Sequence, residues 1–317
     1  MKYFLLLLFF SFSSILIAQG QTYNSRAQNT EGYISMGLQA NALNYFGDLY
    51  SDISFTRPGV GFYLVRKLSP HWHTKLNFMW GYVQADDAKA PINTDLYARN
   101  LNFRNSIKEL TLQLIYELRA SKKRYQDRQK WTPYLWAGLG LIHHNPQAKF
   151  QNQWIDLQPL GTEGQGRPNY ADFYSKIQIA MPIGIGIRFK INERTDITLE
   201  TGLRILFFDY LDDVGGKFVN QGDLGNNLSK QLSNRTLEDT QADGSARQLT
   251  DLASRYGVSS YLGSDNRVYR TLAGFEPNQA RGGSRNDLYL VTGFSISYII
   301  DTGLKCPQFY KTKRTVY

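Results

Sequence analysis

The stretch IQIAMPIGIGIRFKI, residues 177–191, alternates strictly between two kinds of side chain. Every second position, from Ile177 to Ile191, is apolar, and the positions between them carry Gln, Ala, Pro, Gly, Arg and Lys. A helix repeats every 3.6 residues and cannot gather these apolar residues on one face, whereas a strand does. An apolar face that continues this far is typical of a transmembrane β-barrel and rare in a soluble sandwich.

Seven further segments alternate in the same way, and in most of them the positions between the apolar residues carry Gly, Ser and charged residues. They are 33–41, 59–68, 71–83, 106–118, 133–143, 196–208 and 287–300; in 133–143 both phases are apolar. Strands of about 9–11 residues are long enough to cross a bilayer. The sequence therefore predicts an all-β fold, an eight-stranded antiparallel transmembrane β-barrel.

The connections between these segments alternate between long and short. Bacterial outer-membrane barrels have short periplasmic turns and longer external loops. We therefore expect the outer membrane as location, with both termini in the periplasm. The fourth loop leaves two readings open: partial disorder, or an extra hairpin from 255–258 and 267–272. The expected external loops are 42–58, 84–105, 144–176 and 209–286, and the expected turns are 69–70, 120–132 and 192–195.

Composition excludes several other classes of protein. The chain has 317 residues, 42% of them hydrophobic and 14% aromatic, which is too aromatic for a disordered chain. A single apolar run follows Lys2 and predicts a signal peptide over 1–20, with an uncleaved anchor helix as the alternative. The barrel would then span 31–300, followed by a basic periplasmic tail, 301–317. The lone Cys306 excludes an internal disulfide and leaves a free thiol or a bond between chains.

The interior of an eight-stranded barrel is just wide enough for side chains, so the sequence predicts a plugged barrel rather than an open pore. Charges inside must be paired, because an unpaired buried charge costs several kcal/mol. The turn at 192–195 makes Arg188 and Glu200 near neighbours, and we expect these two to pair. Pro182 cannot donate to a sheet and predicts a bulge. The other expected members of the network are Glu109, Glu117, Lys75, Lys190 and Arg204.

Basic residues concentrate on the predicted periplasmic side. Two explanations remain open: attraction to anionic lipid headgroups, or docking to an acidic periplasmic protein. Nucleic acid is excluded as a partner by the compartment. The candidate docking residues are Lys122, Lys123, Arg124, Arg128 and Lys130 in the second turn, and Lys305, Lys311, Lys313 and Arg314 in the tail.

The sequence contains little that indicates catalysis. His71 and His73 are predicted about 25 Å from His143 and His144, too far apart to share a metal. An embedded enzyme would need His143 or His144 beside Asp209, Asp212 or Asp213. Asp48, Asp212 and Asp213 offer oxygen ligands for calcium, but capping of rim turns and pairing with loop arginines such as Arg57, Arg99 and Arg104 explain them better. Gly161–Gly166 precedes no helix and lacks GK[ST], so it is no phosphate loop. We expect no enzyme activity, metal, cofactor or small-molecule substrate.

Several motifs lie outside the alternating pattern: NYFGDL at 44–49, NLNFR at 100–104, LQPLGTEGQG at 157–166 and DYLDDV at 209–214. Their order and spacing resemble the PorG-like outer-membrane proteins of Bacteroidota, a family also described by a domain of unknown function. The resemblance runs from about residue 31 to 220 and resumes at the last strand. Its candidate rim residues are Asp48, Glu163, Asp209, Asp212 and Asp213.

The resemblance implies a small barrel of the type IX secretion machinery that contacts the periplasmic ring of that machine. The chain departs from the family in its very long fourth loop, which leaves a paralogue with another role open. The alternative function is a surface ligand-binding or adhesion barrel that uses external loops 144–176 and 209–286.

Overall fold

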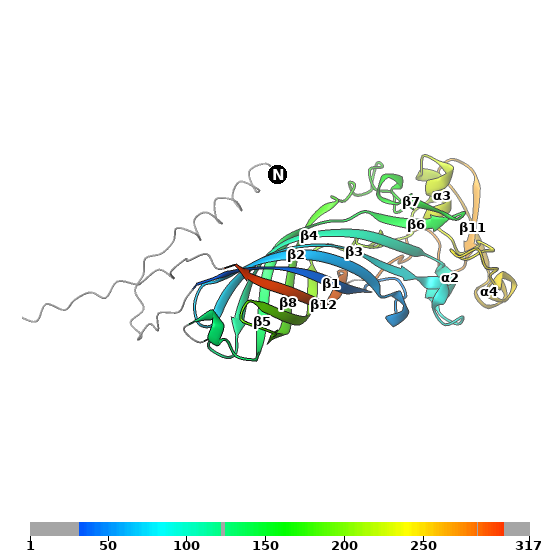
Figure 1. Ribbon diagram of the computed structural model, residues 1–317. Helices are drawn as coiled ribbons and strands as arrows, with labels where there is room; N and C mark the ends of the chain where they lie inside the picture. Colours follow the sequence, from blue (N-terminus) through cyan, green and yellow to red (C-terminus); the bar gives the residue numbers. More distant parts are fainter. Residues whose placement is uncertain (1–31, 122–123, 284, 301–317) are drawn as a thin grey trace, which may run out of the picture.

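Eight antiparallel strands close into a barrel in the computed structural model, which describes residues 32–121, 124–283 and 285–300 (Figure 1). Neighbouring strands follow the order β3-β2-β1-β12-β9-β8-β5-β4, and β4 pairs with β3 to close the ring. The predicted eight-stranded antiparallel barrel is confirmed. Its strands are β1 (Ile34–Phe46), β2 (Arg57–Lys67), β3 (Trp72–Asp86), β4 (Asn102–Glu117), β5 (Trp131–His143), β8 (Ile177–Lys190), β9 (Thr195–Leu206) and β12 (Leu288–Ile300).

The two ends of the barrel differ in the length of their connections. Ile34 pairs with Ile300, so the first and last strands begin and finish at one end, which we call the turn end. The connections at this end are 68–71, 118–130 and 191–194; two of them are short, and 118–130 is longer than the shortest connection of the other end, 47–56. The opposite loop end carries 47–56, 87–101, 144–176 and 207–287. The predicted signal peptide and the tail with Cys306 lie outside the described residues.

The outer wall of the barrel exposes large apolar side chains on every strand. Leu38 is 68% exposed, Leu139 60% and Ile185 56%. A continuous apolar surface of this kind is incompatible with water and matches the lipid-facing band of a transmembrane barrel. Outward-facing representatives of the eight strands are Leu38, Phe62, Trp80, Leu110, Leu139, Ile185, Leu199 and Phe294.

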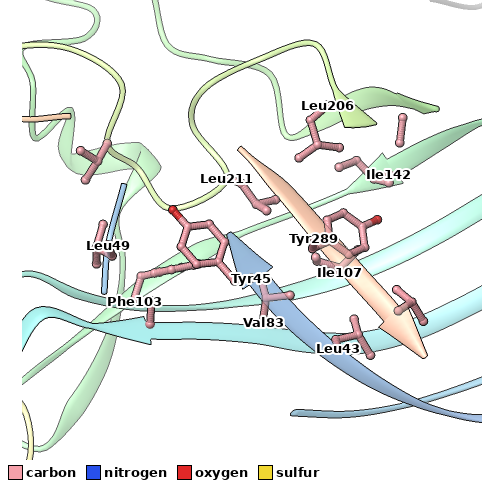
Figure 2. Close-up of a cluster of buried hydrophobic side chains, with 14 of the residues drawn as sticks. Leu43, Tyr45, Leu49, Val83, Phe103, Ile107, Ile142, Leu206, Leu211 and Tyr289 are labelled. Carbon is pink, nitrogen blue, oxygen red and sulfur yellow. The ribbon is translucent and has the colours of Figure 1, made fainter. Parts of the chain in front are cut away.

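The barrel interior is apolar toward the loop end and polar toward the turn end. Leu43, Ile107 and Tyr289 are fully buried in the apolar part (Figure 2). Met79 belongs to the same buried cluster. In the polar part, Trp136 projects inward from β5, and a Cβ at Gly202 would lie 2.3 Å from its ring. Glycine on β9 therefore makes room for a large ring inside a narrow lumen.

Pro182 does not form the bulge predicted from the sequence. The β5–β8 register pairs Ala137 with Ile183 and Gly140 with Ala180, so the register is the same on both sides of the proline. On its other side Pro182 pairs in register with Arg204. The strand pairing passes over Pro182, which lacks an N–H, and no extra residue is inserted into β8. The prediction of a bulge is therefore wrong.

A folded cap of loop elements covers the loop end (Figure 1). The hairpin suggested within the fourth loop is present, because β10 and β11 pair with each other. None of the helices in the described part of the chain is long and apolar enough to cross a membrane. The cap elements are α2 (Asp95–Arg99), α3 (Asn227–Ser233), α4 (Leu249–Tyr256), β6 (Pro146–Phe150), β7 (Gln153–Asp156), β10 (Val258–Leu262) and β11 (Val268–Leu272). Single 3-10 turns lie at Ile53–Phe55, Asp87–Lys89, Tyr125–Asp127, Gln158–Leu160 and Gln221–Asp223.

Candidate functional site

Glu200 on β9 is held inside the lumen by residues from across the barrel. Lys75 Nζ on β3 lies 2.7 Å from Glu200 Oε2, and the Tyr134 hydroxyl on β5 donates to Glu200 Oε1 at 2.6 Å. Lys75 also stands 4.4 Å from the centre of the Tyr63 ring, a cation–π contact. The predicted Arg188–Glu200 pair is wrong. Glu200 lies opposite Gly186, so its carboxylate is free to extend across the lumen.

Arg188 pairs instead with Glu117 of β4, and its Nε lies 3.9 Å from Asp196. Because Arg188 stands opposite Thr198 in the register, its side chain is directed to charges nearer the turn end. Lys190 contacts the backbone carbonyl of Gln126, so it lies outside the lumen charge network to which we assigned it.

A third lumen pair joins Arg204 of β9 to Glu109 of β4, with Nε and Oε2 3.3 Å apart. The Tyr289 hydroxyl donates to the same carboxylate at 2.7 Å. All of the charged lumen side chains named here thus have opposite charges within reach, as burial requires. These paired side chains fill the polar part of the lumen, between its apolar part and the turn end.

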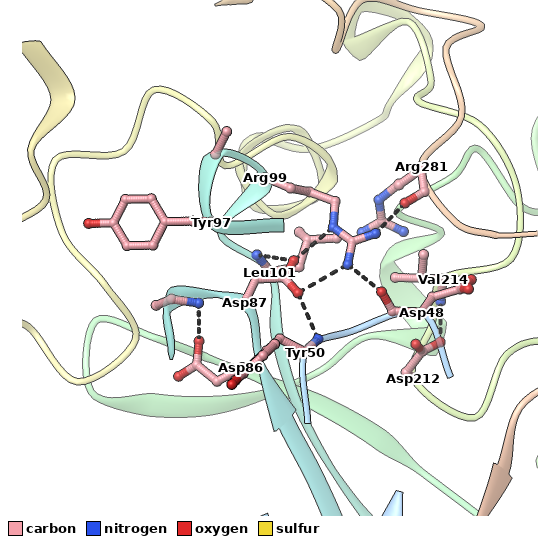
Figure 3. A network of polar contacts seen from close by, with 12 residues as sticks. Asp48, Tyr50, Asp86, Asp87, Tyr97, Arg99, Leu101, Asp212, Val214 and Arg281 are labelled. Carbon is pink, nitrogen blue, oxygen red and sulfur yellow. Dashed lines mark hydrogen bonds and ion pairs between the residues drawn. The ribbon is translucent and has the colours of Figure 1, made fainter. Parts of the chain in front are cut away.

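At the loop end, one buried ion pair joins three of the loops (Figure 3). Arg99 donates to Asp87 through Nε at 2.7 Å and Nη2 at 3.1 Å. The same guanidinium donates to the backbone carbonyls of Asp48 at 2.8 Å and Arg281 at 2.5 Å. Sequence reasoning missed Asp87 and Arg281, because loops have no periodicity that reveals long-range partners.

The rim residue Asp212 belongs to a carboxyl pair bridged by a phenol. The Tyr45 hydroxyl lies 2.5 Å from Asp212 Oδ2 and 2.9 Å from Asp287 Oδ1. One hydroxyl hydrogen serves two carboxylates only as a weaker three-centre bond, whereas a proton on one carboxyl lets that group donate to the phenol oxygen. Burial raises the pKa of Asp287 to about 8, and burial together with the charge of Asp287 raises the pKa of Asp212 well above its ordinary value.

The other rim acids bind side chains of the motif segments. Asp213 accepts from Thr162 Oγ1 at 2.5 Å and from the Tyr174 hydroxyl at 2.7 Å, while burial raises its pKa to about 6. Glu163 forms an ion pair with Arg281 at 3.0 Å. These contacts join the LQPLGTEGQG and DYLDDV segments to each other and to Arg281. Asp209 carries a pKa raised to about 6 by burial.

The arginine partners predicted for Asp48, Asp212 and Asp213 were wrong. Arg57 donates to Gln84, Arg104 donates to Gln147, and Arg99 pairs with Asp87. The side chain of Asp48 lies against a glycine pair instead, since a Cβ at Gly282 would lie 2.3 Å from its Oδ2.

A cavity of about 550 Å³ opens at the loop end among the same three loops. Asp95 of α2 accepts a hydrogen bond from the Tyr256 hydroxyl at 2.8 Å on its wall. The remaining walls combine a glycine-rich backbone with one aromatic ring and two arginines. The lining residues are Gly47, Asp48, Asp95, Leu96, Arg99, Tyr256, Ala273, Gly274, Phe275, Ala280, Arg281, Gly282 and Gly283.

The histidines do not assemble a catalytic or metal site in the described residues. His144 is buried and stacks on Tyr174, with ring centroids 5.8 Å apart, and its Nε2 contacts the Ser175 carbonyl at 3.1 Å. The described residues show no contact of His143 or His144 with Asp209, Asp212 or Asp213, and the enzyme alternative requires such a contact. Nor does any group of three or more His, Cys, Asp or Glu in the described ranges stand ready to hold a metal.

The predicted docking cluster at the turn end is only partly available to a partner. Arg128 is buried and pairs with Asp196 at 2.8 Å, so its assignment as a docking residue is wrong. Arg124 and Lys130 are exposed. The other candidate docking residues, Lys122, Lys123, Lys305, Lys311, Lys313 and Arg314, lie outside the described residues.

Comparison with known proteins places the chain in a family. A family model described as a domain of unknown function (DUF6089) matches residues 11–226, more than half of the chain, and the chain belongs to this family. No curated protein sequence matches significantly.

The chain is also similar to solved barrels. Neisserial surface protein A is 9% identical with a TM-score of 0.37, covering 84% of this chain and 96% of that one. Ail of Yersinia pestis, in complex with a heparin analogue, is 7% identical with a TM-score of 0.34, and the match covers 85% of this chain and 98% of Ail. OprG of Pseudomonas aeruginosa is 10% identical with a TM-score of 0.33, and the match covers 87% of this chain and 100% of OprG. At these values the likeness carries no functional inference.

Proposed function

We propose that the chain is a non-enzymatic barrel of the outer membrane that anchors the periplasmic ring of a type IX secretion machine. The apolar outer wall supports the membrane placement in this proposal, since lipid covers such a surface around a closed barrel. A plugged interior favours a structural role over transport. The loop end then faces outward and the turn end faces the periplasm.

The charge of the turn end supports docking to an acidic partner there. Arg119, Arg124, Lys130 and Arg194 are exposed at this end, against exposed Asp127 and Glu193. Complementary charge directs a partner to this end and accelerates its encounter. The motif resemblance supplies the identity of that partner, a periplasmic ring protein of the secretion machine.

The docking proposal is tested by co-purification from detergent-solubilised outer membranes. Arg119, Arg124 and Lys130 are changed together to Gln, and we expect ring proteins to be lost while the barrel still gives a folded band. The matched control changes three exposed loop-end arginines, Arg255, Arg267 and Arg270, to Gln and should retain the ring proteins. Retention of the ring by the turn-end variant, and by a variant that also lacks 305–317, contradicts the docking role.

The loop-end cavity favours a second candidate function, a surface barrel that binds an external ligand. A volume of about 550 Å³ lies within the range of small-molecule sites, and three loops converge on it. Shortening the loop 207–287 distinguishes the two functions. Secretion should survive this change if the barrel is an anchor, and binding of surface ligands should be lost if it is a receptor.

A further inference from the structure

A row of basic side chains crosses the outer wall where β4 reaches the loop end. Lys108 is exposed and lies on the same face of β4 as the outward-facing Leu110. The register places Lys108 between Trp80 of β3 and His143 of β5, and both of these are exposed. An aromatic and basic row of this kind marks the boundary between hydrocarbon and headgroups.

A second basic row lies farther from the apolar band. The Arg104 guanidinium stands 4.1 Å from the centre of the Trp154 ring, and its Nε and Nη2 both donate to Gln147 Oε1 at 3.1 Å. Lys149 of β6 is the cross-strand partner of Trp154 of β7. The β6–β7 hairpin extends the sheet beside β4 and holds this row in place (Figure 1).

We call Arg104, Lys108, His143, Lys149, Trp80 and Trp154 the β4 patch. Among the residues that the structure describes, no salt bridge joins Arg104, Lys108 or Lys149 to a carboxylate, whereas loop residue Lys89 pairs with Asp243 at 2.9 Å. The nearby acid Asp156 is engaged by the amides of Asn145 and Gln147. Arg104, Lys108 and Lys149 therefore form no ion pair within the described residues, although the neutral amides leave the negative charge of Asp156 in place near them.

The spacing of the two rows exceeds the depth of a simple headgroup. Arg104 and Lys108 are four residues apart, about 13 Å along the strand. A strand tilted by about 40° converts this to about 10 Å of height above the hydrocarbon, whereas an ordinary headgroup layer is about 5–8 Å deep. A lipid that reaches both rows needs a tall headgroup with more than one anionic group. Below Lys108, the row Phe78, Leu110 and Leu141 offers apolar surface for its acyl chains.

We propose that the β4 patch binds a phosphorylated glycolipid of the outward-facing leaflet, with phosphate groups at Lys108 and at Arg104 and acyl chains along β3, β4 and β5. This inference rests on the proposed outer-membrane placement. Arginine on the Trp154 ring is held in a fixed orientation and has donors left for phosphate, the geometry that favours arginine over lysine at such sites.

The test uses the full-length chain, folded in neutral detergent and examined by native mass spectrometry. The probes are bis-phosphorylated lipid A, the same lipid without phosphates, and inorganic phosphate. We expect the bis-phosphorylated lipid to be retained at least tenfold more than the dephosphorylated lipid, and the R104Q/K108Q variant to lose that preference. The control K89Q should behave as wild type.

Two results overturn the inference: equal retention of the two lipids, or full retention by R104Q/K108Q. Inorganic phosphate that competes fully with the lipid at equal concentration also overturns it, because a free anion site would then explain the patch. A folded band on a heat-shift gel and insertion into vesicles are measured in parallel. Failure to insert contradicts the membrane placement, whereas insertion without lipid preference contradicts this inference alone.

Discussion

Replacing Glu200 with Gln should destabilise the barrel strongly. Lys75 is 2% exposed, and its ammonium group is bound by both carboxylate oxygens of Glu200, at 2.9 and 2.7 Å. The E200Q change keeps the shape of the side chain but leaves a buried lysine without an opposite charge. Breaking a buried pair in this way costs about 3–5 kcal/mol. With a urea dependence of about 2–3 kcal/mol per M, the unfolding midpoint should fall by about 1–2.5 M.

The measurement is urea unfolding of the vesicle-inserted barrel, followed by tryptophan fluorescence and by the heat-shifted band on a gel. Glu193, an exposed residue of the 191–194 turn, provides the control, and E193Q should leave the midpoint unchanged. The double variant K75M/E200Q removes both charges and should recover most of the loss. An E200Q midpoint equal to that of wild type refutes the pairing, and so does a double variant as unstable as the sum of the single changes.

Three further predictions concern the rim and the lumen. The pKa of Asp287 is raised to about 8 in the folded protein, so its protonated form contributes its full stability below the ordinary carboxyl range, and this stability is lost as the pH rises through 8. Hydrogen exchange at the loop end, corrected for intrinsic rates, should therefore accelerate between pH 6 and pH 9. An exchange rate that does not change with pH contradicts the shared proton. D87N should leave Arg99 buried without its carboxylate and raise hydrogen exchange in the loops of the loop end about 100-fold, corresponding to about 3 kcal/mol. Exchange equal to that of wild type would contradict the role of Asp87 in joining these loops. G202V should abolish the folded band by colliding with Trp136, and a normal band contradicts the packing of that ring.

The strands were predictable from sequence, because most of them alternate apolar outward positions with glycine, polar or charged inward positions. In 177–191 the alternation of Ile with Gly and charge specifies the direction of each side chain without further information. The alternation of long and short connections then specified which strand ends gather at which end. The expected segments were too short at the loop end, because β1 continues to Phe46, β3 continues to Asp86 and β4 begins at Asn102. In β3 and β4, polar side chains such as Gln84 and Arg104 take the outward positions there in place of apolar ones.

The partners inside the lumen were not predictable in the same way. Arg188 and Glu200 lie close together on the paired strands β8 and β9. In a narrow lumen, however, side chains from opposite walls are as close as those from neighbouring strands, and Glu200 pairs with Lys75 of β3. Arg128 similarly turns inward to Asp196, although its sequence neighbours suggested an exposed basic turn. Loop residues such as Asp87 and Arg281 carry no periodic signal, so their contacts emerge only with the fold.

The central claim, a closed barrel surrounded by lipid, is tested by labelling single cysteines with a fluorophore in vesicle-inserted protein whose Cys306 is replaced by Ser. Labels at Leu139, Ile185 and Leu199 should be quenched by lipid-borne quenchers and protected from aqueous iodide. A label at the loop residue Ile53, which is 87% exposed, should show the reverse. Equal access of iodide to all four positions contradicts the lipid-facing barrel.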